Sequence, residues 1–109
     1  MPDDLAGMDV KLIMTWDIRP GRDQEYFEFL VREWIPGTQN LGLRHTGAWM
    51  TTYSLGNTAQ IMTEGIASDL DAMRDILHSD SWTQLHEQLL DFVINYEQKI
   101  VRVSGHFQI

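Results

Sequence analysis

The sequence predicts an α+β fold of the ferredoxin-like kind, with the element order β-α-β-β-α-β. Strand character is found in residues 10–18, 43–54, 59–67 and 99–109. Two segments with helical periodicity lie between the first and second of these strands and between the third and fourth. Right-handed crossovers through the helices give one four-stranded antiparallel sheet in the order 4-1-3-2, with two helices on one face.

The length of 109 residues is that of one ordinary domain. We expect residues 1–8 to form a flexible leader and residues 9–109 to form the domain. In residues 10–18, apolar side chains alternate with period two, which is typical of a strand with one buried face. The apolar set is Val10, Leu12, Met14, Trp16 and Ile18.

The first helix is predicted after the turn that Pro20 and Gly21 form. Its apolar residues recur at i, i+3, i+4 and i+7, which is the spacing of a buried helix face. They are Phe27, Leu30, Val31 and Trp34. The Pro-Gly pair at 36–37 predicts the end of this helix, with at most one further turn beyond it.

The second and third strands are predicted as a hairpin. Residues 43–54 are rich in Thr, Trp and Tyr, residues 54–58 (SLGNT) form the loop, and residues 59–67 return antiparallel to the second strand. Bulky apolar side chains occur on both faces of this hairpin, as with Trp49 and Met50. Since two helices cover only one face, a homodimer that packs sheet on sheet would bury the other, and the alternative is a monomer with a mildly apolar open face.

The second helical region is predicted in two pieces. Ser68 is expected to cap it, with Asp71 completing a capping box, and Leu70, Met73 and Leu77 form its apolar stripe. The segment HSDS (78–81) is rich in residues that favour caps over helix interiors, so we expect an interruption there and a restart at Ser79 or Ser81.

The restarted helix is predicted over residues 82–98, followed by the last strand over residues 99–109. The expected broad helix face contains Trp82, Leu85, His86, Leu89, Phe92, Val93 and Tyr96. Across the sheet, charged residues of neighbouring strands should approach one another, either as structural ion pairs or as an acid–base group. These are Lys11, Asp17, Glu64, Arg102 and His106.

Charge and composition narrow the function classes. Sixteen acidic residues against eight basic ones give a net charge of −8, which disfavours nucleic acid and anionic membrane surfaces as partners. No cysteine is present, which excludes thiolate nucleophiles and cysteine-ligated metal sites. The acidic start MPDDLAGMDV is unlike a signal peptide, so we expect a cytoplasmic protein.

Several segments together resemble the dimeric α+β barrel superfamily. They are RPGRDQEYFEFL after the first strand, WIPG…LGLRHTGAW leading into the second, and SDSWTQLHEQL in the second helical region. Members include antibiotic-biosynthesis monooxygenase-like, NIPSNAP-like and stress-responsive barrel proteins. The resemblance implies a homodimer whose eight strands close a barrel, and a pocket in each subunit between sheet and helices.

Haem-degrading members of this superfamily use a helix histidine as iron ligand, with a nearby tryptophan and a first-strand asparagine. His86 and Trp82 could correspond to the first two, but their spacing differs, and the first strand offers Thr15 or Asp17 in place of asparagine. Haem is therefore kept only as an alternative cofactor, and the expectation is no cofactor. The four histidines show no zinc-ligand spacing, so no metal site is predicted.

The function expected from the sequence is binding of a small apolar or aromatic molecule, with cofactor-independent oxygenation or isomerisation as the chemistry. His86 is the candidate catalytic residue, because histidine handles protons near neutral pH. Trp16 and Trp82 are the expected pocket walls, and His45 and Tyr53 the expected hydrogen-bonding residues. The alternatives are a non-catalytic dimeric binding or interaction module, a haem-binding protein, and a His86 that only packs in the core.

Overall fold

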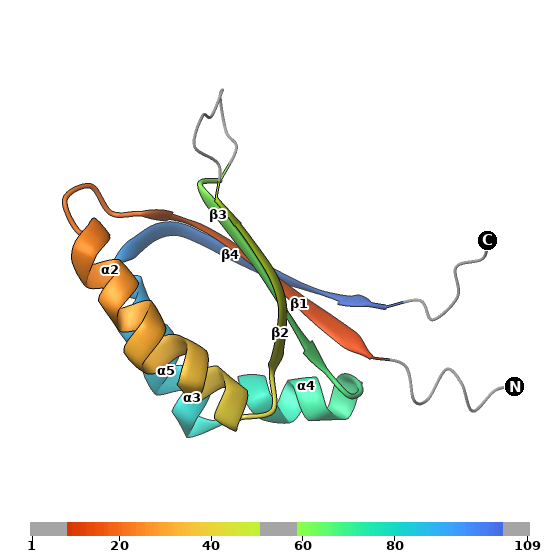
Figure 1. The fold of residues 1–109 in the computed structure, drawn as a ribbon. Coiled ribbons are helices and arrows are strands. Elements are labelled where there is room, and N and C mark those ends of the chain that lie inside the picture. The colour runs from red at the N-terminus through yellow and green to blue at the C-terminus, as the bar shows by residue number, and fades with distance from the viewer. Residues whose placement is uncertain (1–8, 51–58, 104–109) are drawn as a thin grey trace, which may run out of the picture.

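The computed structural model describes residues 9–50 and 59–103, and Figure 1 shows their arrangement. The elements are β1 (Val10–Ile18), α2 (Asp23–Phe29), the π-helical segment η1 (Leu30–Trp34), α3 (Ile35–Asn40), β2 (Arg44–Met50), β3 (Ile61–Ala67), α4 (Leu70–Leu77), α5 (Asp80–Leu90) and β4 (Val93–Arg102). The predicted leader 1–8, the hairpin loop 54–58 and Tyr53 lie outside the described residues.

The predicted α+β ferredoxin-like fold is confirmed. The sheet order is β2-β3-β1-β4 with every neighbouring pair antiparallel, which is the predicted order read from the other edge. The helices lie on one side of the sheet (Figure 1). All five apolar residues of the β1 alternation are buried in the core between sheet and helices, while the side chains between them are only partly buried.

The face that the first helix buries differs from the predicted one. Tyr26, Phe29 and Trp34 are buried, whereas Phe27 is 41 % and Val31 67 % exposed. The cause is η1, because a π-helical turn contains an extra residue and so displaces the buried face relative to a regular 3.6-residue spacing. The helix also continues past Pro36, which lies in the first turn of α3, where a missing N–H is tolerated.

The predicted interruption at HSDS is present, and capping side chains define it. Helix α4 ends at Leu77, and Ser79 caps α5 by accepting a hydrogen bond from the backbone N–H of Trp82 at 3.1 Å. At the start of α4 the cap is Asp69, not the predicted Ser68. Its carboxylate accepts from the backbone N–H of Ala72 at 2.8 Å.

The predicted boundary of the last strand is wrong. Helix α5 ends at Leu90 and β4 begins at Val93. The prediction placed this segment in the helix because a β-bulge in β4 gives its apolar residues a spacing like that of a helix. Ile18 pairs with Val93 and Thr15 with Glu97, so Trp16 faces two residues of β4, Asn95 and Tyr96. Val93 and Tyr96 therefore point to the same side although they are three residues apart.

We predict that the bulge depends on the left-handed backbone of Asn95, whose φ is 58°. Asn95→Val should lower the free energy of unfolding by about 1–2 kcal/mol more than Asn95→Gly does, since a β-branched residue is strained there and glycine is not. Both variants lose the hydrogen bond from Asn95 Nδ2 to Asp17 Oδ2, so their difference isolates the backbone term. Urea unfolding of the two variants measures it, and equal destabilisation would contradict the prediction.

Candidate ligand site between the helices and the sheet

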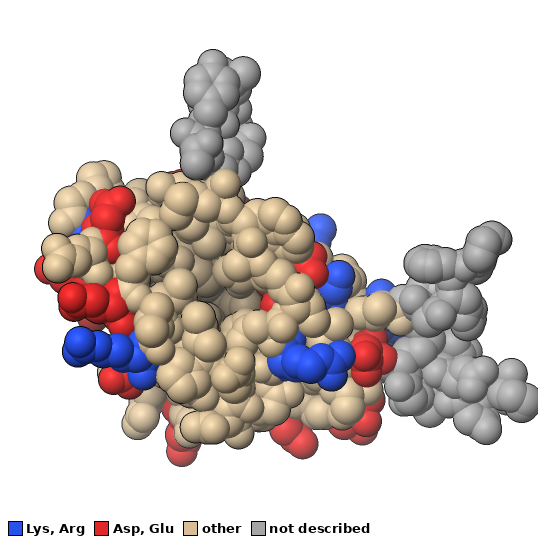
Figure 2. Space-filling model, viewed as in Figure 1, with Lys and Arg blue, Asp and Glu red and all other residues tan. Residues whose placement is uncertain are grey.

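A hollow lies between the helical layer and the sheet. Figure 2 shows it at the centre of the face seen in Figure 1, bordered by α2 and α3 on one side and by β2 on the other, with a rim formed mostly by uncharged residues. Strand pairing shows which residues face the helices but remain uncovered: Ala48 and Met50 in β2, and Gln98 and Ile100 in β4. The helices therefore cover the centre of the sheet and leave space near its edges.

His86 of α5 lies on this side of the sheet, between two aromatic rings. Its imidazole stacks on Trp82, with ring centroids 5.8 Å apart and an interplanar angle of 17°. It meets the ring of Tyr96 edge-on at 4.6 Å. The His86 side chain remains partly exposed, but its Nε2 atom is buried and has no hydrogen-bond partner among the described residues.

The electrostatics of His86 favour its neutral form. Burial lowers the pKa of His86 below its ordinary value, and the neighbouring Glu87 carboxylate raises it by less. A neutral imidazole keeps one nitrogen lone pair that can accept a proton. Buried polar atoms normally have a partner, so an unpartnered ring nitrogen marks a position where a ligand could supply one.

The two rings that contact His86 belong to a larger connected group of aromatic side chains. The ring centroid of Trp16 lies 5.8 Å from that of Tyr96, on which it stacks, and 6.2 Å from that of Trp34, which it meets edge-on. The centroids of Trp34 and Trp82 are 5.3 Å apart. The indole N–H of Trp16 donates to the Tyr26 hydroxyl at 3.0 Å. The positions of Trp82 and Tyr96, and through them that of the imidazole, are thus fixed by core packing.

The predicted pocket walls are more deeply buried than expected. Trp16 has no exposed surface and Trp82 is 5 % exposed, so both form the floor behind His86. Their contact with a ligand remains a prediction. The structure does bring Trp16, Trp82 and His86 into one aromatic group, as the sequence suggested.

His45 of β2 faces the helices, and its imidazole is hydrogen-bonded to Thr38 of α3. Its Nε2 lies 2.7 Å from Oγ1 of Thr38, and that hydroxyl donates to the carbonyl of Trp34 at 2.8 Å. A hydroxyl has one proton to donate, so His45 Nε2 carries the proton of the shared bond. Burial lowers the pKa of His45. No hydrogen bond or ring contact joins His45 to His86 among the described residues.

Two polar residues that the sequence analysis did not select belong to this region. The Tyr96 hydroxyl donates to Oε1 of Gln98 at 2.7 Å, and burial raises the pKa of Tyr96, so this phenol stays protonated. Thr63 of β3 lies between Met14 and Ala48 on the helix-facing side, and its hydroxyl is buried without a partner in the described structure. Tyr96 was missed because its segment was predicted as helix. Thr63 gave no signal beyond its place in the strand alternation.

The charged residues predicted to gather on the sheet separate into different places. Lys11 and Glu64 form an ion pair at 3.1 Å. Asp17 instead accepts hydrogen bonds from the backbone N–H of Gln60 at 2.8 Å and from Asn95. Arg102 pairs with Val10 and so faces the opposite side from Lys11, and His106 lies outside the described residues.

Solved structures with this architecture include proteins of several kinds. A NIPSNAP family protein from Agrobacterium tumefaciens matches with a TM-score of 0.69 and 18 % identity, over 90 % of this chain and 88 % of that one. An ethyl tert-butyl ether d (EthD) family protein from Bacillus halodurans matches with a TM-score of 0.69 and 20 % identity, over 89 % and 100 %. A hydroxynitrile lyase from Passiflora edulis matches with a TM-score of 0.75 and 7 % identity, over 94 % and 99 %.

The chain has a NIPSNAP-like fold. Other solved NIPSNAP and NIPSNAP-like structures share this fold. No family model and no curated protein matches the sequence. At these identities the structural likeness shows the fold alone.

The NIPSNAP-like fold also tests the haem alternative. Thr15 and Asp17 alternate with the buried residues of β1, so they point away from the helices, whereas His86 lies on the helix side. These residues do not fit a haem site of the kind that the resemblance suggested.

In the described part of the chain, no group of three or more His, Asp or Glu could hold a metal ion. No described helix is long and apolar enough to cross a membrane.

We predict that the Thr63 hydroxyl has no partner within the protein. Thr63→Val should then leave the free energy of unfolding unchanged or raise it, because the valine removes a buried polar group without changing the shape. Thr38→Val is the matched control and should cost about 1–3 kcal/mol, since it removes bonded hydroxyl contacts. Chemical denaturation compares the two variants. An equal loss in both would show that Thr63 is hydrogen-bonded after all.

We also predict a pH dependence from the two buried histidines. Burial lowers the pKa of His45 and His86 in the folded state, so the unfolded chain takes up protons first as the pH falls. The stability contributed by the neutral rings is complete above about pH 6.5 and decreases as the pH falls toward the lowered folded values. Urea titrations across this window should show a smaller decrease for the double variant H45Q/H86Q. The prediction would be contradicted if the free energy of unfolding of that variant decreased as steeply with falling pH as that of the wild type.

Proposed function

We propose that this protein binds a small, largely apolar or aromatic molecule in the hollow between helices and sheet, next to His86. The observation that carries the proposal is the neutral, partly exposed imidazole of His86, whose Nε2 lacks a partner and which aromatic rings hold in place. A mostly apolar space with a few polar groups is the usual form of a small-molecule site. The unpartnered Thr63 hydroxyl is a further polar group on the same side of the sheet.

The chemistry that this site supports best is proton abstraction. A neutral imidazole can take a proton from an acidic O–H or C–H of a bound molecule and return it at another atom, which is an isomerisation. Removal of the same proton leaves an electron-rich anion, which is the species that reacts with oxygen in cofactor-independent oxygenation. Both reactions use His86 in the same role, so the proposal covers proton transfer and leaves the later step open.

The second candidate is a binding module without catalysis. The burial of Nε2 favours it, because a base must reach its proton at hydrogen-bond distance. In this case His86 would contribute ring surface to the site, and its loss would weaken binding or folding without removing any turnover. A His86 that only packs in the core would show its role as lost stability, by about 1–3 kcal/mol.

We predict that His86 exchanges protons with its ligand. Hydroxylated aromatic compounds and 1,3-dicarbonyl compounds would first be screened for binding by thermal shift. For compounds that bind, NMR in D₂O would follow deuterium entry at their acidic C–H positions. The wild-type protein should accelerate this exchange, and His86→Gln should bind the compound but lose the acceleration by about 10²-fold or more.

The matched control is His78→Gln, which removes an exposed histidine at the end of α4 and should retain the exchange activity. Binding without accelerated exchange in the wild type would favour the non-catalytic module. Equal exchange in wild type and His86→Gln would exclude His86 as the base.

A further inference from the structure

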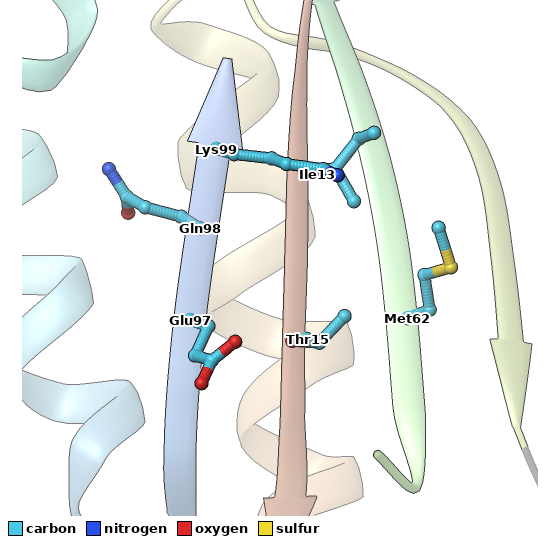
Figure 3. Close-up of a pocket in the computed structure, with 6 residues that line it drawn as sticks. All are labelled: Ile13, Thr15, Met62, Glu97, Gln98 and Lys99. Atoms are coloured by element: carbon cyan, nitrogen blue, oxygen red, sulfur yellow. The ribbon is translucent and has the colours of Figure 1, made fainter. Parts of the chain in front are cut away.

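The last strand presents an exposed amide on the helix side of the sheet. Gln98 of β4 pairs with Met14 of β1, whose side chain is buried between sheet and helices, so Gln98 also points to the helix side. Figure 3 shows the Gln98 side chain projecting from β4 away from β1, whereas the side chain of Lys99 extends across β1. Because Gln98 is exposed, a molecule on the helix side can reach its amide.

Tyr96 connects this amide to His86. The ring centroid of Tyr96 lies 4.6 Å from that of the His86 imidazole, and its hydroxyl lies 2.7 Å from Oε1 of Gln98. Stacking on Trp16 holds the Tyr96 ring in place. The imidazole thus lies against the ring of the phenol, and the amide lies beyond its hydroxyl end. The separation between imidazole and amide is comparable with the length of a phenol.

The hydrogen bond from Tyr96 determines what Gln98 can offer a ligand. Burial raises the pKa of Tyr96, so its hydroxyl keeps its proton and donates it to Oε1 of Gln98. The carbonyl of the amide is therefore engaged, and the two N–H groups at Nε2 make no hydrogen bond within the described part of the chain. Since an amide nitrogen only donates, Gln98 is arranged to recognise an oxygen that accepts.

The next residue on the same side of β4 is apolar. Ile100 pairs with the buried Leu12, so it points to the helix side, and it is 40 % exposed. A carboxylate held at Gln98 would lose part of its hydration against this side chain and would receive only neutral donors. The net charge of −8 would also repel it. A neutral carbonyl with an alkyl group beyond it, as in a ketone, meets the isoleucine without these costs.

We propose that Gln98 selects the ligand, and that the ligand is a neutral aromatic ketone. Its carbonyl oxygen accepts a hydrogen bond from Nε2 of Gln98, and an acidic group at the other end of its ring lies at His86. Tyr96 is a positioning residue, because it holds the amide with the N–H donors free. The inference rests on the proposed ligand site beside His86 and adds the chemical class of the ligand to it.

Three phenols that differ only in the para substituent test this assignment. 4-Hydroxyacetophenone carries the carbonyl, 4-ethylphenol has a methylene group in its place, and 4-hydroxybenzoate carries a carboxylate. NMR titrations would follow the His86 imidazole and the Gln98 side-chain amide. The wild type should bind the ketone about tenfold more tightly than 4-ethylphenol, as one hydrogen bond would give, and 4-hydroxybenzoate more weakly than the ketone. The Gln98 amide should shift with the ketone and not with 4-ethylphenol.

Variants separate the donor role of Gln98 from a structural one. Gln98→Glu keeps an oxygen that accepts from Tyr96 but removes both N–H donors, so it should weaken ketone binding about tenfold and leave 4-ethylphenol binding within about twofold. Tyr96→Phe should reduce the preference for the ketone too, because the amide loses its orientation. Gln84→Glu is the matched control, since it makes the same charge change at an exposed position of α5, and both affinities should stay unchanged.

The outcomes distinguish this inference from the proposed function. If both neutral compounds shift His86 but bind equally well, or if Gln98→Glu weakens both to the same extent, the site stands and Gln98 does not select a carbonyl. Tighter binding of 4-hydroxybenzoate than of the ketone would overturn the assignment of a neutral ligand. If no compound shifts His86, the proposed site fails and the inference fails with it.

Discussion

The β-bulge at Asn95 and Tyr96 is the local feature on which the proposed site depends. Without the extra residue, strict alternation from Val93 would turn Asn95 toward the helices and Tyr96 away from them. With it, Tyr96 stacks on Trp16 and presents its edge to His86. The bulge thus links the buried ring of β1 to the partly exposed imidazole of α5, at the cost of one left-handed residue.

The two faces of the sheet present different surfaces because the helices cover only part of one of them. On the helix side, Tyr26 and Phe29 of α2 and Trp34 of η1 are buried, and these rings fill the centre of the layer. Residues that face the helices remain uncovered near both edges of the sheet. On the side of the sheet that faces away from the helices, Trp49 is 54 % exposed among the described residues.

Much of the fold could be predicted from the sequence because the signals were local. The alternation of β1 and the cap-forming residues of HSDS depend only on neighbouring residues, and both were predicted correctly. Chain connectivity then determined the strand order. The errors came from irregular backbone: one extra residue in η1 moved the buried helix face, and one in β4 made a strand look helical. Neither irregularity has a signature in residue spacing.

The site was harder to predict than the fold. The sequence placed His86 and Trp82 on one helix face, and both lie together on α5. It could not show that His45 is held by Thr38, because that bond joins the end of α3 to β2 and depends on how those elements pack. The unpartnered state of His86 Nε2 and of the Thr63 hydroxyl also depends on tertiary packing. Burial and pairing of single atoms are not encoded in a local pattern.

The most direct test of the central claim, that a ligand binds beside His86, is NMR of the histidine side chains during titration with an aromatic compound that binds. The imidazole resonances of His86 should shift in a saturable way, together with the ring protons of Tyr96, while those of the exposed His78 stay constant. Saturable shifts confined to Ile13, Thr15 and Met62, on the side of the sheet that faces away from the helices, with His86 unmoved, would contradict this account.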